Sequence, residues 1–157
     1  MKKLKNFEIE NLVNAGVLAL TTNTLSSPDA YVVFKFRKAI RVAAKSLEEN
    51  RREALVEAGI EDGVAFDKKR KELSSITEPT EEQKTELIAL DAKFKKFQEL
   101  MVALYSDEVE FPNIKPISFS AWHTLLAENK NTRINAYIEE LLEGILWSEP
   151  EENYSGE

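Results

Sequence analysis

The sequence contains no cysteine and a single histidine, His123. The absence of cysteine excludes disulfide bonds, thiolate metal ligands and cysteine nucleophiles. One imidazole leaves little room for a histidine-rich metal site, and no G-x-S-x-G motif accompanies it, as a serine hydrolase of that type would require. Its apolar neighbours Trp122, Leu125 and Leu126 indicate a helix flank, so we expect a structural or solvent-facing histidine.

Phosphate-binding loops are missing as well. The five glycines never form G-x-G-x-x-G, and no G-K-[ST] follows Gly59 and Gly63, which are better explained by a helix end and a turn. The carboxylates of Asp107, Glu108 and Glu110 are hard oxygen ligands, but they lack the spacing of a calcium-binding loop, so we expect a solvated edge there. We therefore expect no enzymatic activity, no metal and no cofactor.

No apolar run approaches the roughly 18 to 20 residues needed to cross a bilayer. With 43% hydrophobic and 31% charged residues, the composition is typical of a globular protein. Residues 1–5 weakly resemble the start of a secretory signal, but Glu8 and Glu10 interrupt the apolar stretch that such a signal requires. We expect a soluble, cytoplasmic protein, with a single helical domain over residues 1–148 and an acidic, flexible tail over residues 149–157.

Charge is unevenly distributed along the chain. The net charge of -7 lies in residues 134–157, which hold seven acidic residues and no basic one, whereas residues 1–133 are balanced. In the opposite sense, residues 30–47 contain no acidic residue and five basic ones, Lys35, Arg37, Lys38, Arg41 and Lys45. On a helix this run would place a basic face toward solvent, which can bind a phosphate backbone. The alternative is a solvated flank that pairs with acidic side chains of a neighbouring helix or of the tail.

Apolar spacing predicts two helices in the first third of the chain. The first covers residues 7–22 and is capped by Asn6. The second covers residues 29–58 and ends at Gly59. Its apolar seam follows a three-and-four spacing: Val33, Phe36, Ile40, Ala43, Leu47, Asn50 and Ala54.

A third long helix is predicted to begin at Thr80, which forms a capping box with Gln83, and to end near Tyr105. Its seam is Leu87, Leu90, Phe94, Phe97, Met101 and Leu104. The irregular segment before it favours at most a short helical turn over residues 68–73. Because each long helix presents a narrow apolar seam, we expect the two to pack as an antiparallel hairpin.

The chain changes character after this helix. Residues 108–111 and 115–119 predict a small two-stranded β-ribbon, confined to edge pairing by Pro112 and Pro116. The predicted fold class is therefore mostly α: a long antiparallel helical hairpin packed with N- and C-terminal helices, plus this ribbon.

Two helices are predicted near the C-terminus. The first is short and capped by Ser118 or Ser120, and the second is capped by Asn131 or Thr132 and ends near Leu146. This last third also holds the aromatic residues Trp122, Trp147 and Tyr154. Such side chains either anchor a protein interface or cover a small core, and both interpretations stay open at this point.

A resemblance to a known family rests on five segments of the chain: residues 3–12 (KLKNFEIENL), 34–40 (FKFRKAI), 45–49 (KSLEE), 108–111 (EVEF) and 114–118 (IKPIS). They resemble a family of small phage and prophage proteins of unknown function. The resemblance implies a mobile-element origin, expression in a bacterial cytoplasm and small accessory or assembly proteins as neighbours. It supplies no active site.

These observations favour a non-enzymatic accessory or assembly protein that acts by protein–protein interaction, with self-association into a homo-oligomer as one form of it. The alternative is a nucleic-acid-binding accessory protein that uses the basic helix face. We expect no membrane partner.

Overall fold

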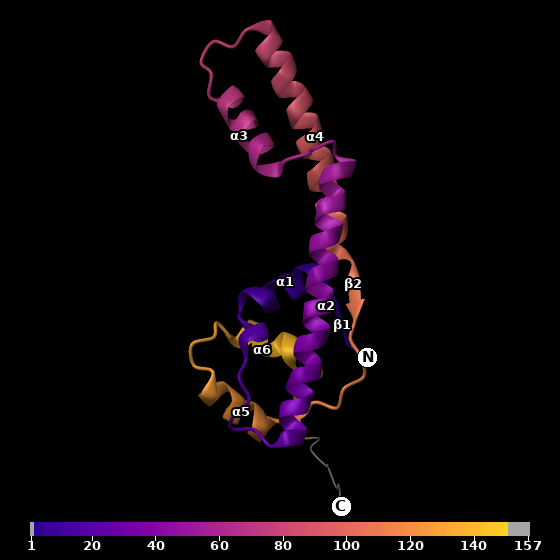
Figure 1. Ribbon diagram of the computed structural model, residues 1–157, viewed down its shortest axis with the longest axis vertical. Helices are drawn as coiled ribbons and strands as arrows, with labels where there is room; N and C mark the ends of the chain where they lie inside the picture. Colours follow the sequence, from indigo (N-terminus) through magenta and orange to yellow (C-terminus); the bar gives the residue numbers. More distant parts are fainter. Residues whose placement is uncertain (1, 151–157) are drawn as a thin grey trace, which may run out of the picture. The chain divides into compact units, whose positions relative to one another are not determined.

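The computed structural model describes residues 2–150 (Figure 1). These residues are mostly helical, with two small sheets of two strands each. The elements in chain order are β1 (Lys3–Lys5), α1 (Asn6–Asn14), the 3-10 turn η1 (Val17–Ala19), α2 (Ser27–Glu57), α3 (Gly63–Ser74), α4 (Glu81–Ser106), β2 (Glu108–Glu110), β3 (Ile117–Ser118), α5 (Phe119–Glu128), α6 (Ala136–Leu142) and β4 (Trp147–Ser148).

The described chain divides into two compact units. One contains the residues up to Lys45 together with those from Glu108 onward, and the other is Ser46–Asp107. The division falls within α2, so this helix contributes to both. We call them the first and second unit and describe each by itself; the prediction of one domain over residues 1–148 stays a prediction.

Helix α2 confirms the long helix predicted from apolar spacing. Its inward-facing side chains Val33, Phe36 and Ile40 are fully buried in the core of the first unit. Gly59, with φ +76°, follows the helix in the left-handed conformation that ends many helices. Among the predicted seam positions Asn50 is exposed, because a polar amide gains nothing from an apolar contact.

The two segments predicted to form one ribbon are strands, but they do not pair with each other. β2 pairs with β1 in antiparallel fashion, with Leu4 opposite Val109. β3 pairs with β4 in parallel, with Ile117 opposite Trp147. The predicted pairing was wrong because the partners come from distant parts of the chain. Short strands carry no sequence signal for a distant partner.

Helix α1 is shorter than the predicted helix over residues 7–22. It ends at Asn14, and Gly16 adopts φ +90°, a left-handed conformation that no helix interior allows. The predicted cap, Asn6, is the first helical residue, and Lys5 occupies the cap position. The carboxylate of Glu8 accepts the Lys5 backbone amide at 2.7 Å, which satisfies an N-terminal donor in place of the Asn6 side chain.

The C-terminal helices also differ in part from their predictions. α5 is capped by Ser118, one of the two residues predicted for this position. α6 is capped by Asn135 rather than by Asn131 or Thr132, and it ends at Leu142 instead of Leu146. The chain turns at Gly144, where φ is +78°, and then enters β4.

The N-terminal segment stabilises the end of α6. The Lys2 ammonium group donates to the backbone carbonyls of Glu140, Leu141 and Glu143 at 3.1, 3.1 and 2.6 Å. A cation at the C-terminus of a helix satisfies unpaired carbonyls and interacts favourably with the helix dipole. Lys2 therefore links the N-terminal segment of the first unit to its C-terminal segment.

The second unit consists of α3 and α4, which pack against each other, and the last part of α2. α4 opens with the predicted capping box of Thr80 and Gln83, and it packs against both α2 and α3. α3 is a full helix rather than the short turn predicted over residues 68–73. Asp62 caps it by accepting from the amides of Val64 and Ala65 at 3.0 and 3.1 Å.

We predict that Gly16→Ala lowers the free energy of unfolding of the first unit by about 1–2 kcal/mol, because alanine is strained at positive φ. A Cβ there would meet Thr132 at an ordinary 3.8 Å, so the backbone alone carries the cost. The measurement is urea unfolding followed by the fluorescence of Trp122 and Trp147, which both lie in this unit. Gly63→Ala is the control, since Gly63 has no positive φ; an equal loss in that variant would contradict the explanation.

Candidate functional site

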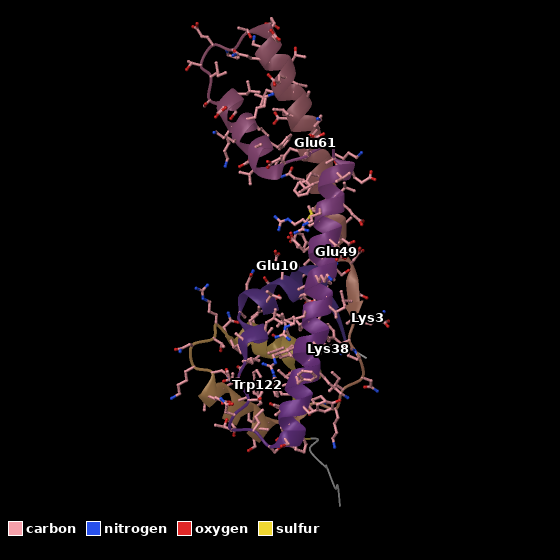
Figure 2. The ribbon with its side chains drawn as sticks, viewed as in Figure 1. Lys3, Glu10, Lys38, Glu49, Glu61 and Trp122 are labelled. Carbon is pink, nitrogen blue, oxygen red and sulfur yellow. The ribbon has the colours of Figure 1, made fainter. Side chains whose placement is uncertain are left out.

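The predicted basic face lies on the outer side of α2 in the first unit. Lys35, Lys38, Arg41 and Lys45 are all exposed, and their three-and-four spacing aligns them along one face of the helix. Lys38 is labelled on α2 in Figure 2. We call these four residues the basic strip. Their alignment is fixed from the opposite side, where Val33, Phe36 and Ile40 are buried.

The cationic groups of the basic strip have no acidic partner among residues 2–150. None of the four forms an ion pair or a hydrogen bond with another described residue. Some cations elsewhere are paired, as Lys3 is with the carboxylates of Glu108 and Glu110 at 3.8 and 3.4 Å. Others, such as Lys115 and Lys130, also form no ion pair with a described residue. The alternative of a flank neutralised by a neighbouring helix therefore finds no support in the described part of the chain.

Arg37, the fifth basic residue of the predicted face, is placed differently. It is half-buried, and its Nη1 donates to the Leu20 backbone carbonyl at 2.6 Å. Its Nε is buried without a hydrogen-bond partner among the described residues. The guanidinium thus links the segment after η1 to α2 by a hydrogen bond. Arg37 therefore does not belong to the basic strip.

Two aromatic side chains extend the outer face of α2 toward its N-terminus. Tyr31 and Phe34 are 56% and 49% exposed, and their rings lie 6.1 Å apart with an angle of 15° between their planes. The Lys35 ammonium group sits 4.7 Å from the centre of the Tyr31 ring. The sequence pattern alone did not identify either aromatic side chain as a surface residue. Their position relative to the buried seam was the signal that could have identified them.

The tryptophans considered as interface residues are in the core of the first unit. Trp122 is fully buried and Trp147 nearly so, and their rings stack 6.0 Å apart. Trp122 Nε1 donates to the Glu139 carboxylate and Trp147 Nε1 to the Glu139 backbone carbonyl, each at 3.1 Å. Core packing therefore describes these two residues, and Tyr154 lies outside the described residues.

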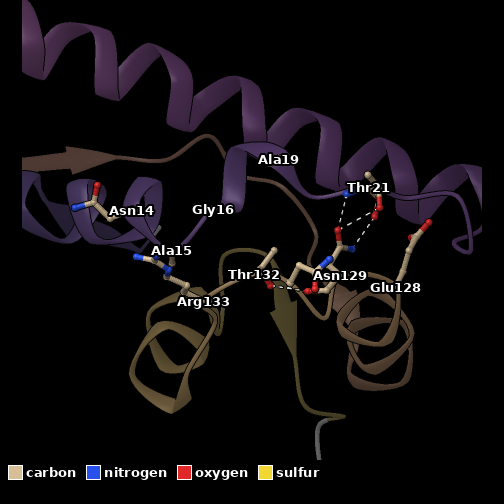
Figure 3. A pocket seen from close by; sticks show the side chains of 10 residues that line it. Asn14, Ala15, Gly16, Ala19, Thr21, Glu128, Asn129, Thr132 and Arg133 are labelled. Carbon is tan, nitrogen blue, oxygen red and sulfur yellow. Dashed lines mark hydrogen bonds between the residues drawn. The ribbon is translucent and has the colours of Figure 1, made fainter.

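A polar hollow of ≈ 410 Å³ opens between α1 and α5 in the first unit (Figure 3). Its central side chain, Asn129, accepts from the Thr21 amide at 2.8 Å and donates to the carbonyls of Thr21 and Leu125 at 2.9 and 2.8 Å. Glu128 accepts from the Asn23 amide at 2.8 Å. The Asn129 amide and the Glu128 carboxylate therefore hold the segment after η1 against the end of α5.

An apolar groove of ≈ 450 Å³ lies in the second unit, between α3, α4 and the end of α2. Its apolar walls come from three short stretches of chain, and charged residues lie at its rim. The lining residues are Leu55, Ile60, Val64, Phe66, Phe94 and Phe97, with Arg51, Asp62, Gly63 and Asp67 beside them.

Two of the three charged side chains beside the apolar groove already have partners within the second unit. Asp62 caps α3, and Asp67 pairs with Lys71 at 2.8 Å. Arg51 forms no ion pair or hydrogen bond with another described residue. The groove therefore combines an apolar floor with one available positive charge.

The residues weighed for catalysis and metal binding do not assemble into a site. His123 is exposed and meets the Phe119 ring edge-on, with ring centres 4.3 Å apart. Within residues 2–150, no group of three or more histidine, aspartate or glutamate side chains is arranged to hold a metal ion. Over the same range, no helix is long and apolar enough to cross a membrane.

No protein family, curated protein or solved structure matches this chain. The resemblance to small phage and prophage proteins stays an interpretation of the sequence.

Arg37 and its neighbour on the basic strip give a test of their different roles. We predict that Arg37→Met lowers the free energy of unfolding by about 1–3 kcal/mol, because the Leu20 carbonyl loses its donor. Lys38→Met replaces an exposed side chain that has no described partner by one of similar length. It should change the free energy of unfolding by less than about 0.5 kcal/mol. Urea unfolding measures both, and equal stabilities of the two variants would contradict the anchoring role of Arg37.

Proposed function

We propose that the protein is a non-catalytic interaction protein that holds a helix of a partner protein in the apolar groove. The observation that carries this proposal is the incomplete burial of the α4 seam. Of its six predicted positions only Met101 is buried, whereas Phe94 and Phe97 are only partly buried and line the groove. The resemblance to phage and prophage proteins adds an accessory or assembly role as the context.

The shape and composition of the groove favour an amphipathic helix as the occupant. Apolar side chains of α2, α3 and α4 line the groove, and an amphipathic partner helix can insert its own apolar side chains, at three-and-four spacing, into a groove of this kind. Leaving large apolar side chains in water has a free-energy cost that a partner would remove. Val64, 82% exposed at the edge of the groove, would become buried in such a complex.

The rim of the groove indicates one polar feature of the partner. Arg51 is the charged side chain there that lacks a described counterion, while Asp62 and Asp67 have theirs. A carboxylate on the partner helix would meet this guanidinium in a geometry that favours paired hydrogen bonds. We therefore propose a partner helix with an apolar ridge and an acidic residue at its flank.

The test is affinity capture from the native host with the full chain as bait, after nuclease treatment, with bound proteins identified by mass spectrometry. We predict that a partner retained by the wild type is lost with Val64→Glu, which introduces a charge into the apolar contact. Arg51→Glu should weaken binding about tenfold or more, because it replaces an attractive pair with the partner's carboxylate by like-charge repulsion. Ile88→Glu is the control, because Ile88 is 70% exposed on α4 and does not line the groove.

Retention of the partner by all three variants would contradict the groove as the binding surface. A dimer in solution that Val64→Glu dissociates would identify the partner as a second copy of the chain. Turnover of a substrate by the purified protein would contradict the non-catalytic role.

A further inference from the structure

We propose that the outer face of α2 binds single-stranded nucleic acid, with the basic strip contacting phosphates and Tyr31 and Phe34 stacking on bases. This inference does not depend on the apolar groove, because all its residues lie in the first unit and the groove lies in the second.

The charge of this surface is complementary to a polyanion. The basic strip presents four cations without a described counterion, in a protein whose net charge is -7. Because the chain as a whole repels nucleic acid, attraction would be concentrated at this strip. At about 1.5 Å of rise per residue, Lys35 and Lys45 are about 15 Å apart along the helix, which matches about four phosphate spacings on a stacked strand.

The aromatic pair supplies the second half of such a site. Both rings are about half exposed and nearly parallel, so part of each ring surface is accessible beside the cations. Base stacking on exposed aromatic side chains next to a basic groove is the usual mode of sequence-tolerant single-strand binding. The Lys35 ammonium group over the Tyr31 ring keeps a cation at the point where a backbone would pass.

The same features argue against a duplex or a membrane as the ligand. The bases of a duplex are already stacked, so Tyr31 and Phe34 would remain unused. A membrane-binding helix inserts its apolar face, but the apolar face of α2 is buried with Val33, Phe36 and Ile40 in the core. Single-stranded nucleic acid uses both the cations and the rings.

The experiment measures the fluorescence anisotropy of a labelled oligothymidylate of about 15 nucleotides, titrated with the full-length protein at about 50 to 200 mM salt. Four phosphate contacts predict a slope of about -3 for log K against log salt. The double variant Lys38→Gln/Arg41→Gln should make the slope shallower by about 1.4. Lys115→Gln/Lys130→Gln is the matched control, because both lysines are exposed in the same unit and neither belongs to the basic strip.

The aromatic contribution is tested separately. Tyr31→Ala and Phe34→Ala should each weaken binding about fivefold or more while the salt slope stays the same, since stacking involves no counterion release. Arg37→Met should leave the slope unchanged, because this guanidinium donates to the Leu20 carbonyl. Val64→Glu in the groove should also leave oligonucleotide binding unchanged, which keeps the two proposals distinguishable.

Four results would overturn the proposal. One is the absence of binding at the lowest salt concentration. A second is binding that the Lys38/Arg41 double variant does not weaken. A third is a matched duplex bound more tightly than the single strand, and the fourth is adsorption to phosphatidylserine vesicles without oligonucleotide binding.

Discussion

The first unit depends on the burial of one face of α2. Val33, Phe36 and Ile40 are fully buried, and this fixes the rotation of the helix about its own axis. Because successive residues of a helix are related by a constant rotation, fixing the inner face also determines the outer one. The basic strip is therefore held in a defined line by the core, and it can carry unpaired cations at no cost to packing.

Much of the helical framework could be predicted from sequence. The long pattern of α2 and its end at Gly59, like the capping box of α4, are local signals that agree with the three-dimensional result. The ends of α1 and α6 could not be predicted in this way, because apolar residues continue at helical spacing beyond Gly16 and Gly144. Strand pairing was missed because it joins residues far apart in the chain.

The candidate site shows the same limit. A run of bases without acids identified Lys38 and its neighbours, since exposure follows from the helical pattern. The different role of Arg37 depends on a carbonyl at Leu20 that only the folded chain brings near. Burial of Trp122 and Trp147 likewise depends on Glu139, which accepts from both. The apolar groove could not be predicted from the sequence, because α3, which forms one side of it, has a weak apolar pattern.

The first unit has a fully buried apolar core, whereas most of the α4 seam in the second unit is only partly buried, and we propose that a partner helix covers it. Native-state hydrogen exchange of the full chain tests this difference most directly, because it gives the free energy of opening residue by residue. We predict that amides at Phe94 and Phe97 in α4 exchange at a lower free energy than amides at Phe36 and Ile40 in α2. Equal protection of the two groups in the absence of a partner would contradict the account.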